Sequence, residues 1–200
     1  MPRTAIIHYW LVGMRGGERV LERLLHLYPD ADIFTHVYDA DAMSPIIRAR
    51  NVRTTFIQKL PGAKTHYQKY LPLMPMALEE LDLRGYDLVI SSESGPAKGV
   101  IAAPDARHVC YCHSPMRYLW DHYHDYKAAA GGVARLAMPW MFHNMRVWDV
   151  TRAAARAAVR RAARCPAPPP PARRPAPAAG SAARWPPAWR TAARRAAAGR

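Results

Sequence analysis

Two short segments of this sequence combine residue types that could bind a ligand or take part in catalysis. The first is residues 13–18 (GMRGGE), where paired glycines lie between an apolar run and a helical pattern. Glycine lets a backbone approach a ligand closely, and a helix N-terminus offers free N–H groups and a positive dipole end to a phosphate. The spacing matches neither the Walker pattern nor G-x-G-x-x-G, so an ordinary glycine turn remains the alternative.

The second segment, residues 108–121 (HVCYCHSPMRYLWD), is predicted to be a strand that leads through His113 into a helix. Pro115 suits the first helical turn, and Ser114 is the expected cap. His113 would then stand at the carboxyl end of a strand, with Arg117 about one helical turn beyond it. A single histidine in such a place is more often structural than functional, so both interpretations stay open.

Apolar runs and helical patterns alternate through residues 5–150. We expect strands at residues 5–10, 32–38, 52–56, 87–91, 99–102 and 108–112, and helices at 16–28, 65–83, 116–126 and 133–149, the second of them broken by Pro72 and Pro75. This alternation predicts an α/β protein with a Rossmann-like parallel sheet and helices on both faces. Ligands bind at the carboxyl ends of such strands, here the loops 11–17, 91–98 and 113–117.

The formal charge of +14 belongs to the end of the chain. Residues 151–200 contain 12 Arg and no Lys, Asp or Glu, which leaves 17 basic and 15 acidic residues in 1–150. We therefore expect one domain at 1–150 and a low-complexity Ala/Arg/Pro-rich tail at 151–200. Residues 151–164 could extend the preceding helix, whereas the chain from Cys165 onward lacks the apolar side chains that offset ordering entropy and is expected to be disordered or polyproline-like.

The tail has a second explanation, a shift of reading frame near residue 151, because Ala, Arg, Pro and Gly are the residues that GC-rich codons encode. An evolved basic linker is the alternative, and the coding DNA would decide between them. Arginine-rich tails bind polyphosphates without specificity, but the sequence contains no module that reads nucleic-acid grooves. A non-enzymatic basic binding protein remains an alternative function, and we expect no specific nucleic-acid partner.

Cysteine usage and hydropathy indicate a cytoplasmic protein. Three cysteines are too few for a disulfide framework, and no run reaches the ~18–20 apolar residues of a spanning helix. Cys110 and Cys112 lie two apart on one strand and are expected to face the core. Together with His113 and the histidines of residues 122–125 they suggest a zinc site, but their spacing fits no standard zinc pattern, and no metal is expected.

A basic segment without acidic residues lies between Asp41 and Glu79. Its six cations are interleaved with aromatic side chains, a combination that can dock on anionic lipid headgroups at a membrane surface. The cations are Arg48, Arg50, Arg53, Lys59, Lys64 and Lys69, and the aromatics are Phe56, Tyr67 and Tyr70. A solvated basic face is an equally good explanation. The sequence thus allows a peripheral position at the inner membrane face.

Four ordered blocks resemble bacterial family 4 glycosyltransferases of the GT-B fold. They are residues 10–21 (WLVGMRGGERVL), 29–34 (PDADIF), 86–92 (YDLVISS) and 110–121 (CYCHSPMRYLWD). Many enzymes of this kind are mannosyl- or rhamnosyltransferases of surface-polysaccharide assembly. The resemblance covers residues 5 to about 150, and the four blocks together are far more specific than any one of them.

The resemblance implies that residues 1–150 are the N-terminal, acceptor-side domain of a glycosyltransferase. In that family the glycine turn approaches the donor diphosphate and the acceptor, which points to Gly16 and Gly17. The cleft histidine contacts the donor sugar, which points to His113, and Arg117 is a weaker candidate for donor or acceptor binding. The implied partners are a nucleotide-sugar and a polysaccharide or lipid-linked acceptor, with neither a metal nor another cofactor.

The chain also departs from this family. The family's second domain carries a pair of glutamates and a basic pair that neutralises the leaving diphosphate, and nothing after Asp149 resembles it. Because transfer depends on that electrostatic stabilisation, we expect this chain as written to transfer little or no sugar. Another Rossmann-type nucleotide-sugar enzyme, such as an epimerase, is an alternative, but the sequence lacks the dinucleotide fingerprint that it would need.

Overall fold

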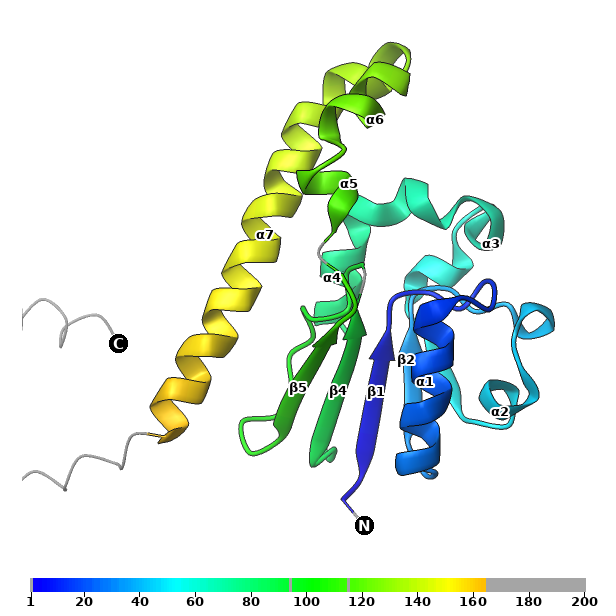
Figure 1. Cartoon of the computed structure of the whole chain (residues 1–200), viewed down its shortest axis with the longest axis vertical. Helices are drawn as coiled ribbons and strands as arrows, with labels where there is room; N and C mark the ends of the chain where they lie inside the picture. The colour runs from blue at the N-terminus through cyan, green and yellow to red at the C-terminus, as the bar shows by residue number, and fades with distance from the viewer. Residues whose placement is uncertain (1, 94, 115, 165–200) are drawn as a thin grey trace, which may run out of the picture. The chain divides into compact units, whose positions relative to one another are not determined.

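The computed structural model describes residues 2–93, 95–114 and 116–164 of the chain (Figure 1). By its internal contacts the chain divides into two units, Met1–Ala162 and Ala163–Arg200. The sheet and the helices that position the candidate site belong to the first unit. The expectation of disorder from Cys165 onward lies outside the described residues.

A five-stranded parallel sheet forms the centre of the first unit. Its strands are β1 (Thr4–His8), β2 (Asp32–Thr35), β3 (Val52–Thr54), β4 (Leu88–Glu93) and β5 (Arg107–Cys112). They are arranged in the order β3-β2-β1-β4-β5, and every neighbouring pair is parallel. Figure 1 shows β2, β1, β4 and β5 side by side in this order. The prediction of a Rossmann-like α/β sheet is therefore confirmed.

The sheet is covered on both faces because its central strands are apolar on both. All five residues of β1 are buried. On one face Ile6, Ile33 and Ile90 pack with the apolar side of α1 (Gly16–Leu27) and with α2 (Pro45–Arg48). On the other face, Ile7 and Val89 pack under the connections that precede β4 and β5. This layering makes the carboxyl edge the accessible end of the sheet.

The predicted strand at 99–102 is wrong, because residues 99–102 form no strand. Ala97 and Val100 of this connection are buried against Val89 on the face of the sheet opposite α1, and Trp148 packs against the same cluster. A short apolar run can cover a sheet as well as extend it, and periodicity alone does not distinguish the two. This connection therefore covers β4 on that face of the sheet.

Proline divides the predicted helix at 65–83 as expected. The structure has α3 (Ala63–His66), the 3-10 helix η3 (Tyr67–Leu73), which contains Pro72, and α4 (Met74–Glu79), which begins next to Pro75. Two shorter 3-10 helices, η1 (Ala40–Ala42) and η2 (Phe56–Lys59), lie in the connections after β2 and β3. Together these elements bring the basic segment back across the sheet.

In the described residues after β5 the chain forms three helices. The predicted helix at 116–126 is two, α5 (Arg117–Trp120) and α6 (Tyr123–Ala129), and the last is α7 (Gly132–Arg164). Met116 occupies the N-cap position of α5, so Ser114 is not its cap, and Pro115 lies outside the described residues. The helix α7 continues past residue 150, as the helix propensity of Ala and Arg favours. Among the described residues, no helix is long and apolar enough to cross a bilayer.

Candidate functional site

The sheet topology brings the two predicted site segments to the same edge. The turn with Gly16 follows β1, and His113 follows β5, with β4 between these two strands. The backbone N–H of His113 donates to the Glu93 carbonyl at 2.8 Å, which continues the β4–β5 ladder by one residue. Since all strands are parallel, the glycine turn and His113 both lie at the carboxyl edge.

A polar contact chain runs across this edge beneath the surface. His113 Nε2 lies 2.8 Å from Ser92 Oγ, and the same hydroxyl lies 3.3 Å from His8 Nδ1. His8 and Ser92 are directly opposite each other in the β1–β4 register, and both are fully buried. One serine hydroxyl therefore bridges two histidine rings that are far apart in sequence.

Glu18 extends the contact chain from the first turn of α1. One of its carboxylate oxygens, Oε2, accepts a hydrogen bond from the Arg15 backbone N–H at 2.9 Å, which satisfies a free donor at the helix start. The other oxygen, Oε1, lies 3.8 Å from His8 Nε2. Within the described residues His8 Nε2 is buried without a hydrogen-bond partner, so the carboxylate is its nearest ionic contact. The Glu18 and His8 side chains are 1% and 0% exposed.

Burial and the contacts within the chain together set the charge states of these groups. Burial lowers the pKa of His8 and outweighs the opposing influence of Glu18. Burial alone would raise the pKa of the Glu18 carboxyl, but its contacts with His8 and Arg15 outweigh burial and hold that pKa below its usual value. Burial is the main cause that lowers the pKa of His113, and the electrostatic influence of His8 lowers it further. At neutral pH both imidazoles are therefore neutral and the carboxylate is ionised.

The two glycines of the turn differ in the space around them. A Cβ atom added to Gly17 would overlap the Tyr9 hydroxyl oxygen and come within 3.3 Å of the His8 ring. A Cβ added to Gly16 would meet nothing within 4 Å. Gly17 is thus required for packing α1 against the end of β1. Gly16 alone leaves open space at the start of the helix.

Arg117 begins α5 with an exposed side chain. Its guanidinium lies 3.7 Å from the Asp121 carboxylate and 3.0 Å from His122 Nε2, both within the next turn of the chain. Among the described residues, Arg117 and the His113 ring share no hydrogen bond, because the polar partners of Arg117 are these local ones and that of the His113 ring is Ser92. The role of Arg117 in binding stays a prediction.

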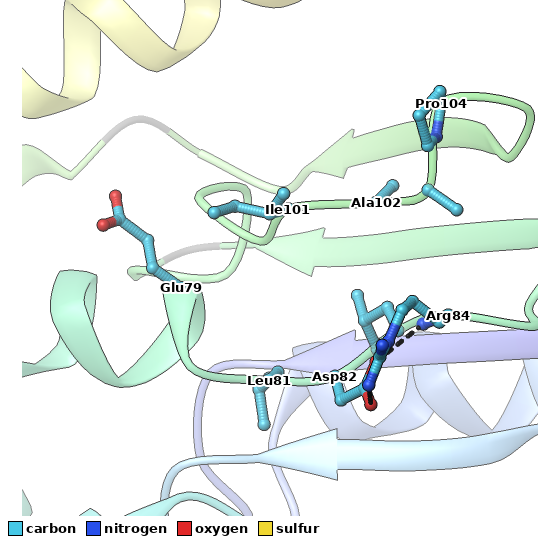
Figure 2. Close-up of a pocket in the computed structure, with 9 residues that line it drawn as sticks. Glu79, Leu81, Asp82, Arg84, Ile101, Ala102 and Pro104 are labelled. Atoms are coloured by element: carbon cyan, nitrogen blue, oxygen red, sulfur yellow. Dashed lines mark hydrogen bonds and ion pairs between the residues drawn. The ribbon is translucent and has the colours of Figure 1, made fainter. Parts of the chain in front are cut away.

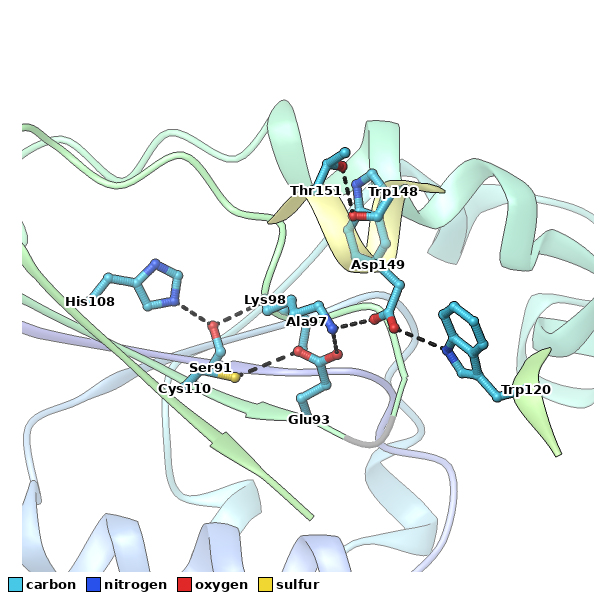
Figure 3. Close-up of polar contacts among 10 residues, drawn as sticks. All are labelled: Ser91, Glu93, Ala97, Lys98, His108, Cys110, Trp120, Trp148, Asp149 and Thr151. Carbon is cyan, nitrogen blue, oxygen red and sulfur yellow. Dashed lines mark hydrogen bonds and ion pairs between the residues drawn. The ribbon is translucent and has the colours of Figure 1, made fainter. Parts of the chain in front are cut away.

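A second polar cluster fastens α7 to the sheet (Figure 3). Lys98 Nζ lies 3.1 Å from the Glu93 carboxylate and also pairs with Asp149. The Trp120 indole N–H donates to the other oxygen of Asp149 at 3.2 Å. The Glu93, Lys98 and Asp149 side chains are 2%, 13% and 13% exposed. This ion cluster links the loop after β4 to α5 and α7.

The outer strand β5 is less buried than its apolar sequence suggests. Cys110 is only partly buried and Cys112 is exposed, so the expectation that both face the core is wrong. The physical reason is that β5 has no neighbour on its outer side in the described sheet, and its Tyr111 is 50% exposed. Ser92 and Glu93, expected in the loop 91–98, belong to β4, and the hydroxyl of Ser91 in the same strand lies 2.7 Å from His108 Nε2.

The basic segment places its charges outward and its aromatic rings inward. Tyr67 is buried, and Phe56 and Tyr70 pack against the same small core around Ile57. Lys64 pairs with Asp39 at 2.9 Å. Within the described part of the chain, the exposed cations of this segment that form no ion pair are Arg48, Arg53, Lys59 and Lys69, of which Arg53 lies over the Phe34 ring and near Asp32. Any docking on an anionic surface would therefore depend on charge rather than on aromatic insertion.

A shallow groove of about 270 Å³ lies away from this edge (Figure 2). It runs between the segment that enters β4 and the segment that enters β5, and it is lined by residues 79, 81–84 and 101–104. It contains none of the candidate site residues. Among the residues that the structure describes, no group of three or more histidine, cysteine, aspartate or glutamate side chains could hold a metal ion.

Sequence analysis missed three members of the contact chain. His8 and Ser92 lie inside strands, and Glu18 has the ordinary position of an acidic residue in a first helical turn. One signal was present, because a polar residue at the last position of a buried strand lies at the ligand-binding edge. Comparisons with protein-family models, curated proteins and solved structures find no match for this chain.

Proposed function

We propose that residues 1–150 are the N-terminal, acceptor-side domain of a GT-B glycosyltransferase of the family 4 type. Its reaction is hexosyl transfer from a nucleotide-sugar to a polysaccharide or lipid-linked acceptor. The observation that supports this most is the contact chain that joins the glycine turn of α1 to His113 through Glu18, His8 and Ser92. The sequence blocks that resemble the family contain all of these residues except His8.

In this proposal the start of α1 binds the diphosphate of the donor, and His113 binds its sugar. The first N–H groups of a helix have no partner within the helix and favour anions, and a Cβ added to Gly16 in the first turn of α1 would meet nothing within 4 Å, which supports the approach of a diphosphate there. His113 follows β5 on the far side of β4, where a neutral ring can hydrogen-bond a sugar hydroxyl. This arrangement needs no metal ion, because the helix dipole and N–H groups favour the anionic part of the donor.

Ligand binding, and not sugar turnover, is the direct test, because in the resembled family the leaving diphosphate is stabilised mainly by a second domain. The 200-residue chain is titrated calorimetrically with GDP-mannose, UDP-glucose and dTDP-rhamnose, and with the corresponding nucleoside diphosphates. We expect one nucleotide-sugar to bind more tightly than its diphosphate. Replacing His113 by alanine should weaken only this sugar-dependent part, by about tenfold or roughly 1.4 kcal/mol.

His26→Ala is the matched control, because His26 is exposed near the other end of α1 and contacts no candidate site residue. Binding should survive this change. If none of the nucleotide-sugars binds, or if His113→Ala binds them as well as the unsubstituted chain does, the glycosyltransferase assignment fails.

We also propose that the protein acts in the cytoplasm, with peripheral contact to an anionic membrane through the basic segment. The support is the outward orientation of Arg48, Arg53, Lys59 and Lys69. Co-sedimentation with vesicles of increasing anionic lipid content tests the contact. The double variant Lys59→Glu/Lys69→Glu should bind vesicles less, and binding that does not depend on lipid charge would contradict it.

A further inference from the structure

The contact chain beneath the carboxyl edge has a direction that follows from counting protons. It consists of Glu18 in α1, His8 at the end of β1, Ser92 in β4 and His113 after β5. The three inner members, Glu18, His8 and Ser92, are 1%, 0% and 0% exposed. Water therefore does not supply alternative donors or acceptors to them, and each must satisfy its neighbours.

The first link places the proton of His8. Its Nε2 faces the ionised Glu18 carboxylate at 3.8 Å, inside a buried region where electrostatic interactions are strong. A lone pair on Nε2 would point at a negative oxygen, whereas a proton there is attracted to it. A neutral imidazole carries only one ring proton, so His8 Nδ1 is left with its lone pair.

The second and third links carry this orientation to His113. Because His8 Nδ1 can only accept, the Ser92 hydroxyl at 3.3 Å must donate its single proton to it. The Ser92 oxygen can then only accept from His113 Nε2, which lies 2.8 Å away. The neutral His113 ring thus has its proton on Nε2, and Nδ1 keeps a lone pair.

We propose that Glu18, acting through His8 and Ser92, fixes the proton of His113 on Nε2 and so keeps Nδ1 as a hydrogen-bond acceptor. Within the described residues the only hydrogen bond of the His113 ring is the one to Ser92, so Nδ1 is available to a ligand. A ligand that binds Nδ1 must present a hydrogen-bond donor such as a hydroxyl, and its identification as a sugar hydroxyl of the donor rests on the proposed function. Glu18, His8 and Ser92 are positioning residues, since none of them needs to touch that ligand.

Nuclear magnetic resonance of the full, 15N-labelled chain measures this arrangement directly, because long-range correlations identify the protonated nitrogen of each ring. We expect one tautomer for His8 and His113, protonated on Nε2 in both. Glu18→Gln should reverse the chain. The glutamine oxygen can still accept from Arg15 N–H, and its amide group then faces His8 Nε2 as a donor. Both rings should shift together toward protonation on Nδ1.

Ser92→Ala separates a relay from a set of independent contacts. In this background Glu18→Gln should still change the His8 tautomer but no longer that of His113, and Ser92→Thr should restore the coupling. His36 serves as an internal control, because its ring binds Thr55 and the Pro96 carbonyl instead. A proton on Nδ1 of His113 in the unsubstituted chain overturns the proposal, as does a His113 ring that ignores Glu18→Gln.

Adding ligand distinguishes the relay from the proposed function. A bound nucleotide-sugar, chosen from GDP-mannose, UDP-glucose and dTDP-rhamnose, should shift the His113 Nδ1 resonance toward its hydrogen-bonded value, and the matching nucleoside diphosphate should not. If the relay is observed but no nucleotide-sugar shifts Nδ1, the relay stands and the sugar-transfer proposal fails. If a nucleotide-sugar binds but the tautomers do not respond to Glu18, the reverse conclusion holds.

Discussion

His8 Nδ1 and Ser92 Oγ face each other at 3.3 Å across the β1–β4 register, and both side chains are fully buried from solvent. The pair connects the two halves of the candidate site, since Glu18 contacts His8 and His113 contacts Ser92. Such a buried pair must affect stability as well as ligand binding, because neither group has water as an alternative partner.

Ser92→Ala should therefore destabilise the fold by about 1–3 kcal/mol, because it leaves His8 Nδ1 buried without its hydrogen-bond donor. Urea unfolding followed by circular dichroism measures the difference. Ser44→Ala is the control, since the buried Ser44 hydroxyl has no hydrogen-bond partner among the described residues. Equal losses in the two variants would show that the His8–Ser92 contact contributes nothing.

The ion cluster at α7 predicts a large effect of one lysine. Lys98→Met removes the cation between Glu93 and Asp149 and leaves two carboxylates close together with little solvent, at a cost of about 3 kcal/mol. Arg84→Met breaks the exposed ion pair with Asp82 and should change stability little. Unfolding free energies of the two variants, compared at the same salt concentration, test the contrast. A Lys98 variant as stable as the Arg84 variant would rule out a stabilising role for the cluster.

The free energy of unfolding should decrease as the pH falls, because of His36. Burial lowers the pKa of His36 from 6.5 to about 4, while its ring donates to the Pro96 carbonyl. Between these two values the unfolded chain binds a proton that the folded chain does not, so acidification favours unfolding. The loss is complete near pH 4 and amounts to roughly 3 kcal/mol, after which this group adds no further dependence.

His36→Gln should remove the part of this dependence that His36 contributes, whereas His26→Ala should leave the dependence in place. The rest should remain in His36→Gln, since the pKa values of His8 and His113 are also lowered. Urea titrations between about pH 7 and pH 4 measure the slope. A slope that is unchanged by His36→Gln would contradict the burial argument.

The paired glycines should respond differently to the same substitution. Gly17→Ala adds a Cβ that overlaps the Tyr9 hydroxyl, and overpacking of this kind costs about 1–3 kcal/mol. Gly16→Ala adds its Cβ to open space and should be neutral or stabilise the helix by up to about 1 kcal/mol. Thermal unfolding compares the two. The ligand titration adds an independent measure, since only Gly16→Ala places a methyl group where the phosphate is proposed to approach.

Much of the fold was predictable because burial leaves a strong pattern in sequence. The apolar run around Ile6 and Ile7 is typical of a strand covered on both faces, and the leucines of α1 repeat with helical spacing. Pro75 lies in the first turn of α4, next to the break before that helix, whereas Pro72 lies inside η3 and the break between α3 and η3 has no proline. The strand at 99–102 was mispredicted because a short apolar run that lies on a sheet and one that joins it have the same composition.

The alternation of strands and helices was enough to predict that the turn with Gly16 and the residue His113 lie at one edge, because parallel strands joined by helices all end on the same side. The residues that lie between them could be seen only in the folded structure. Contacts such as Glu18 to His8, Ser92 to His113 and Lys98 to Asp149 depend on strand register and side-chain rotamers. Hydrophobic periodicity specifies which face a residue occupies, but not which polar neighbour it finds there.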